Sequence, residues 1–206
     1  DWLDPNAPLL SRFLKSGGYA TAHFGKWHLA NDMIPDAPFP SEYGFDEYGA
    51  FNCSGPQMYV HDDVKSAIPF IEKSQASGNP FFINLWIHEP HTPFHVDPKL
   101  QKHFAKLGEK DAIYAATLFH ADLRIGQLLD ALDRLNLAKD TLVIFSSDNG
   151  PARGAPDAPL TLGYDSATGL GYGIAAAKGV TGGRRAYKGA LLEGGIGVPF
   201  IARWPG

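Results

Sequence analysis

Residues 81–87 read FFINLWI, an unbroken apolar run of strand length. Such runs are typical of strands that are buried on both faces of a parallel sheet. Apolar residues recur at helical spacing on both sides of this run, which predicts helices over residues 62–77 and 111–136. A second apolar run, TLVIF at residues 141–145, predicts another buried strand.

The N-terminal part of the chain follows the same order. A short helix is predicted over residues 6–16 and a strand over residues 19–24. The alternation of helices and strands predicts an α/β fold with a mainly parallel sheet flanked by helices. Residues 31–60 are rich in Pro and Gly and are predicted to be a long irregular connection. Residues 151–188 are predicted to be a long loop that is either functional or mobile.

Composition excludes several classes of protein. The chain has 206 residues, of which 44% are hydrophobic, so it is a folded protein rather than a disordered one. A net charge of −4 without a Lys/Arg run gives no reason to expect a nucleic-acid partner. The single Cys excludes an internal disulfide framework, and no apolar stretch of this segment is long enough for a membrane span.

Polar side chains gather where three of the predicted strands end. The three clusters are Lys26 with His28 after the first strand, His88 with His91 after the second, and Asp148 with Asn149 after the third. Ligands of α/β sheets bind beyond the carboxyl ends of the strands, so these three clusters are candidates for one site.

Each cluster also has an ordinary structural interpretation. Asp148 and Asn149 offer the oxygen ligands that Ca²⁺ or Mg²⁺ prefers, but Asp-Asn-Gly is also a common turn. Lys26 and His28 could hold an anionic ester and move a proton, or could be a surface pair beside a packed Trp. Spacing alone favours a solvated Lys188.

The histidine turn HEPHTP at residues 88–93 is more specific, because two prolines fix the direction of His91. A zinc site ranks lower here because no third soft ligand stands nearby. The other histidines of this region, His95, His103 and His120, are predicted to face solvent or a helix surface.

Four motifs in order along the chain resemble the sulfatase family, and the order carries more weight than any one motif. The motifs are residues 18–29 (GYATAHFGKWHL), 80–93 (PFFINLWIHEPHTP), 141–151 (TLVIFSSDNGP) and 188–206 (KGALLEGGIGVPFIARWPG). The resemblance implies the alkaline-phosphatase-like fold, which agrees with the α/β prediction.

Roles in catalysis follow from this resemblance position by position. Lys26 and Lys188 would contact the sulfate oxygens, and Lys26 would also support the nucleophile. His28 would hydrogen-bond a hydrated formylglycine, and His91 would act at the bridging ester oxygen. Ser54 falls only loosely where some family members place a polar side chain near the nucleophile.

The resemblance also implies a metal site, in which Asp148 and Asn149 would be two ligands of Ca²⁺, in preference to Mg²⁺. The family's remaining ligands, a pair of N-terminal aspartates, are not found in residues 1–206. Its Cys-x-Pro-x-Arg nucleophile motif is not found either, since Cys53 stands in CSGP. We therefore expect residues 1–206 to be part of a single catalytic domain truncated at both ends, inactive when isolated, with the formylglycine upstream of residue 1.

The expected function is that of a sulfuric ester hydrolase, which cleaves sulfate monoesters of small molecules or carbohydrates. The alternatives are a phosphonate or phosphate ester hydrolase of the same superfamily and a non-catalytic protein that binds anionic glycans. The family resemblance implies an exported protein, located in a periplasm, outside the cell or in a lysosome.

Overall fold

The computed structural model describes residues 2–30, 34, 36–51, 58–165 and 169–205. They belong to two compact units, residues 1–88 and residues 89–206, here called the N-terminal and the C-terminal unit. Cys53 and Ser54 lie outside the described residues.

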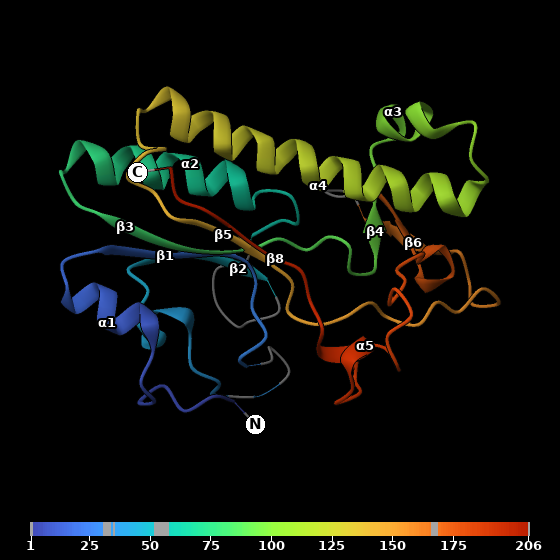
Figure 1. Cartoon of the computed structure of the whole chain (residues 1–206), viewed down its shortest axis with the longest axis horizontal. Coiled ribbons are helices and arrows are strands. Elements are labelled where there is room, and N and C mark those ends of the chain that lie inside the picture. The colour runs from blue at the N-terminus through green and yellow to red at the C-terminus, as the bar shows by residue number, and fades with distance from the viewer. Residues whose placement is uncertain (1, 31–33, 35, 52–57, 166–168, 206) are drawn as a thin grey trace. The chain divides into compact units, whose positions relative to one another are not determined.

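The N-terminal unit is built on a parallel sheet in the strand order β2-β1-β3. The central strand is β1 (Ala20–Lys26), with β2 (Glu47–Phe51) and β3 (Phe81–Trp86) as its neighbours. Helices α1 (Leu10–Ser16) and α2 (Asp63–Ala76) lie on opposite sides of this sheet (Figure 1). The predicted parallel sheet with flanking helices is thus confirmed.

The core of this unit forms on both faces of β1. Phe24 contacts Phe70 of α2, with ring centroids 6.0 Å apart. The neighbouring residue His23 points to the other face and contacts the rings of Trp27 and Phe45. Because both faces are covered, the interior of β1 is fully buried.

Two details of this unit differ from the sequence prediction. The run at residues 81–87 was expected to be buried on both faces, but β3 is an edge strand in the described sheet and Trp86 is exposed. Residues 31–60 were expected to be irregular, but they contain the strand β2 and the 3₁₀-helix η1 (Pro40–Tyr43). The sequence pattern does not indicate β2, because the strand is short and Gly49 interrupts it.

The C-terminal unit is organised around the long helix α4 (Glu109–Arg134), which confirms the helix expected over residues 111–136. Phe94 of strand β4 (Phe94–His95) is buried against Ile113 of this helix, and its ring lies 5.8 Å from that of Tyr114. The remaining helices of the unit are short: α3 (Pro98–Gln101), η2 (Lys102–Phe104), η3 (Ile174–Ala176) and α5 (Glu193–Ile196). In the described residues no helix combines the length and apolar character needed to cross a membrane.

The strands of this unit are antiparallel and partly unexpected. Strand β5 (Val143–Ser146) confirms the strand expected at residues 141–145, and it pairs with β8 (Phe200–Arg203). The expected burial is wrong, because this two-stranded sheet leaves Ile144 and Phe145 exposed.

The stretch at residues 151–188, expected to be a loop, contains a hairpin of β6 (Thr161–Asp165) and β7 (Gly169–Tyr172). Strand β7 also pairs with β4, in the order β4-β7-β6. The pattern hid this hairpin because glycines replace side chains on one face, at Gly163 and Gly171. His95, expected to face solvent, is buried in β4.

Candidate active site

Lys26 is the last residue of β1, and the backbone on both sides of it is anchored. At Gly25 the φ angle is +107°, and a Cβ atom there would lie 2.1 Å from the Trp86 carbonyl oxygen, so only glycine fits. Trp27 is buried, and its backbone N–H donates to the Phe51 carbonyl at 2.9 Å. This arrangement leaves Lys26 half-buried at the carboxyl end of the central strand, and His28 exposed two residues later.

The buried residue His23 supports the same bend. Its Nε2 donates to the Lys26 carbonyl at 3.1 Å. Burial lowers the pKa of His23 to about 4, although hydrogen bonds with the backbone of Lys26 and Gly25 act in the opposite direction. His23 is therefore a neutral imidazole with its proton on Nε2 at neutral pH.

His91 lies in an exposed turn with cis peptide bonds before Pro90 and Pro93. Its Nδ1 donates to the Thr92 carbonyl at 2.6 Å. A neutral ring with its proton on Nδ1 carries the lone pair on Nε2, and a doubly protonated ring can donate from Nε2. The turn thus determines which ring nitrogen carries the proton when the ring is neutral.

The structure brings Lys188 to the end of β5, where Asp148 and Asn149 stand. The N–H of Lys188 donates to the Pro151 carbonyl at 2.9 Å, and the N–H of Gly150 donates to the Gly195 carbonyl at 2.8 Å. These backbone hydrogen bonds join residues that are 37 and 45 positions apart in sequence, so the two segments lie side by side. The proximity of Lys188 to the candidate metal ligands could not be seen from spacing.

Glycines make this close approach possible. A Cβ atom at Gly150 would lie 2.1 Å from the Gly194 carbonyl oxygen, and a Cβ at Gly194 would lie 1.9 Å from the Ala186 carbonyl oxygen. A side chain at Gly150 would push the two segments apart, and one at Gly194 would displace the backbone at Ala186 within the segment that carries Lys188.

The ligand chemistry of Asp148 and Asn149 fits part of a site for a hard cation. The Asp148 carboxylate is exposed, and the Asn149 amide nitrogen donates to the Gly150 carbonyl at 2.9 Å, so the amide oxygen is the remaining ligand atom. Ca²⁺ takes six to eight oxygen ligands, so these two side chains supply a fraction of a complete site.

The six candidate residues are divided between the units. Lys26 and His28 belong to the N-terminal unit, while His91, Asp148, Asn149 and Lys188 belong to the C-terminal unit.

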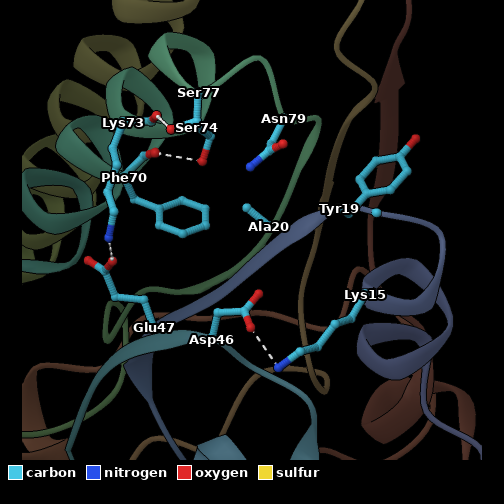
Figure 2. Close-up of a pocket in the computed structure, with 11 residues that line it drawn as sticks. Lys15, Tyr19, Ala20, Asp46, Glu47, Phe70, Lys73, Ser74, Ser77 and Asn79 are labelled. Atoms are coloured by element: carbon cyan, nitrogen blue, oxygen red, sulfur yellow. Dashed lines mark hydrogen bonds and ion pairs between the residues drawn. The ribbon is translucent and has the colours of Figure 1, made fainter.

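A pocket of the N-terminal unit lies away from these candidate residues. This pocket of about 450 Å³ lies beside Ala20, at the opposite end of β1 from Lys26. Figure 2 shows the side chains that line it. Its charged side chains are paired, Lys15 with Asp46 at 2.6 Å and Lys73 with Glu47 at 2.9 Å. None of the six candidate residues lines it.

Sequence reasoning missed a buried ion pair near His91. Arg124 of α4 donates from Nη2 to Glu89 Oε2 at 2.5 Å, and both side chains are buried. A signal was present, because Arg124 lies beside Ala121 and Ile125 on the stripe of α4 that was expected to be apolar. An arginine in such a stripe indicates a buried partner.

Comparison with known proteins identifies the family. A family model described as Sulfatase matches residues 3–206, so the chain belongs to the sulfatase family.

Individual relatives are distant and longer. N-acetylgalactosamine-6-sulfatase from Sus scrofa is 26% identical over 239 residues, covering 96% of this chain and 40% of the relative. An ulvan-active sulfatase from Formosa agariphila is 29% identical over 187 residues, covering 72% of this chain and 36% of the relative. The chain thus spans less than half the length of these relatives.

A solved structure shows the same fold. The crystal structure of Ps i-CgsB in complex with k-i-k-neocarrahexaose matches with a TM-score of 0.76 at 23% identity, over 100% of this chain and 49% of that one.

Proposed function

We propose that the full-length protein is a sulfatase that hydrolyses sulfate monoesters, with sulfated carbohydrates as the first substrate class to test. Membership of the family supports the reaction, and the names of the relatives, which include an N-acetylgalactosamine-6-sulfatase and an ulvan-active sulfatase, support the substrate class. The observation that carries the proposal is the backbone hydrogen bond from Lys188 to Pro151, which brings the Lys188 segment beside the one that carries Asp148 and Asn149.

Residues 1–206 are, on this proposal, part of one larger catalytic domain. The family model spans both units, and the chain covers 40% of the first relative's length. Exposed apolar side chains on β5 and β8, including Ile144, Phe145, Phe200 and Ile201, support further covering structure. Export of the protein remains a prediction from the family alone.

The cations of this chain would stabilise the transition state. Negative charge moves toward the leaving oxygen as the sulfate ester bond breaks, and the sulfuryl oxygens remain charged. Lys26 and Lys188 would hold those oxygens, and preorganised charges of this kind are usually the largest catalytic contribution. Removing one such contact typically costs about 100- to 1,000-fold in kcat.

His91 and His28 would handle protons. A doubly protonated His91 can donate from Nε2 to the leaving oxygen while Nδ1 stays hydrogen-bonded to Thr92, a step worth about 100- to 10,000-fold. His28 would hydrogen-bond the nucleophile. A formylglycine outside residues 1–206 would supply that nucleophile, and a Ca²⁺ held partly by Asp148 and Asn149 would polarise the sulfate oxygens.

The test is sulfate release by the full-length protein, produced in a host that forms formylglycine. We expect turnover of 4-nitrophenyl sulfate and of sulfated monosaccharides, at least about 100-fold lower kcat for Lys26→Ala, and no change for the exposed control Lys65→Ala. Treatment with EDTA should abolish turnover, and Ca²⁺ should restore it better than Mg²⁺. Full activity of Lys26→Ala and His91→Ala would contradict the proposed site, and full activity after EDTA would contradict the metal.

A further inference from the structure

Glu89, which lies two residues before His91, forms a buried ion pair with Arg124 of α4. The two side chains are 1% and 7% exposed. By contrast, the pair Lys15–Asp46 is open to solvent, with side chains 48% and 40% exposed. Taking two charges out of water is costly, and a buried pair often adds little net stability. Net stability alone therefore does not explain why a buried ion pair lies next to the histidine turn.

A second anchor holds the other end of the same turn. Phe94, three residues after His91, is buried against Ile113 and the ring of Tyr114. Ile113 and Arg124 are eleven residues apart on α4, which is three helical turns, so they face the same side of the helix about 16 Å apart. The histidine turn is thus fixed at both ends to one face of α4.

The ring of His91 takes its orientation from this turn. Its Nδ1 donates to the carbonyl of the next residue, Thr92, so the ring follows the local backbone. The position of that backbone in turn depends on the anchor at Glu89. A shift at the ion pair would move Nε2 of His91 without removing any group from the site.

We infer that Glu89 and Arg124 are positioning residues that set where Nε2 of His91 meets the leaving oxygen of the substrate. The inference rests on the proposed function. It goes beyond it by assigning to helix α4 a role in proton delivery, although neither residue of the pair touches the reacting atoms.

The test compares two substrates of the full-length protein that differ in their need for a proton. The leaving group of 4-nitrophenyl sulfate departs readily as an anion, while the alcohol of a sugar sulfate needs protonation. We expect Arg124→Met and Glu89→Gln to lower kcat for the sugar sulfate roughly 10- to 100-fold, and for the aryl sulfate less than about threefold, with KM nearly unchanged. Arg124→Lys, which keeps the charge, should recover part of the loss.

A double-mutant cycle separates positioning from general damage to the fold. If the pair acts through His91, the double variant His91→Ala/Arg124→Met should have a kcat for the sugar sulfate less than about twofold below that of His91→Ala alone. The matched control is Lys73→Met, which breaks the exposed Lys73–Glu47 pair and should change neither substrate.

Other outcomes would overturn the inference. Equal losses on both substrates, or losses that multiply independently of His91→Ala, would show a purely structural role. If Arg124→Met does not fold, Glu89→Gln and Arg124→Lys decide by the same criteria. Absence of turnover by the wild-type protein would overturn the proposed function together with this inference, whereas wild-type turnover with equal losses would overturn the inference alone.

Discussion

The protonation state of His23 affects the stability of β1, the strand that carries Lys26. The ring is fully buried among Trp27, Phe45 and Trp86, and it donates to the Lys26 carbonyl. Protonation would place a charge in this aromatic environment. The sequence does not indicate this burial, because a single His between apolar neighbours is also common at a protein surface.

The pKa of His23 predicts a loss of stability in mild acid. Its folded pKa of about 4 lies below the ordinary 6.5, so between these values the unfolded chain binds a proton that the folded chain does not. Stability should therefore fall as the pH drops from about 6.5 to about 4, by roughly 3 kcal/mol from this residue.

The variant His23→Gln keeps a hydrogen-bond donor but cannot titrate. We expect its free energy of unfolding, measured by urea denaturation at pH 7, 6, 5 and 4, to decline less than that of the wild type. Parallel decline of the two proteins would show that His23 does not control the acid response.

At the scale of elements, the segment at residues 185–195 depends on glycine for its close contact with the end of β5. The N–H of Gly194 donates to the Arg185 carbonyl at 2.8 Å, and the segment carries Lys188 to Pro151. This backbone packing, rather than a side-chain interaction, sets the position of Lys188.

Gly194→Ala should therefore displace Lys188. The added Cβ would meet backbone oxygens of Ala186 and Arg185, neither of which can rotate away. We expect at least about a 100-fold loss in kcat/KM for a sulfate ester, the loss expected for one removed charge contact. The control Gly126→Ala, in the interior of α4 with nothing within 4 Å, should keep full activity and stabilise the protein by about 0.5–1 kcal/mol. Wild-type kinetics for Gly194→Ala would contradict this account.

The sequence predicts elements well where side chains carry the periodicity. The helix α4 and the strands β1, β3 and β5 follow from apolar spacing. The β6–β7 hairpin does not, because glycines stand at Gly163 in β6 and at alternate positions of β7, Gly169 and Gly171. Of the candidate site, the six residues come from local motifs, whereas the Glu89–Arg124 pair depends on packing between segments 35 residues apart.

At the scale of the whole molecule, the chain has the fold of a sulfatase and leaves apolar strands uncovered. Phe200, Ile201 and Trp204 are all more than half exposed in and next to β8. Monomeric soluble proteins seldom expose contiguous apolar surface of this kind, which supports a larger domain in the full-length protein. The catalytic account therefore applies to that protein rather than to residues 1–206 alone.

The central claim is that the full-length protein acts on sulfate esters. The most direct measurement is the ratio of kcat/KM for 4-nitrophenyl sulfate to that for 4-nitrophenyl phosphate, two substrates with the same leaving group. We predict a preference for sulfate of at least about 100-fold, because discrimination reflects differential binding of the two transition states. Equal or faster turnover of the phosphate would contradict the account and favour a phosphate or phosphonate ester hydrolase. Turnover of neither, with retained binding of sulfated glycans, would contradict it in favour of a non-catalytic binding protein.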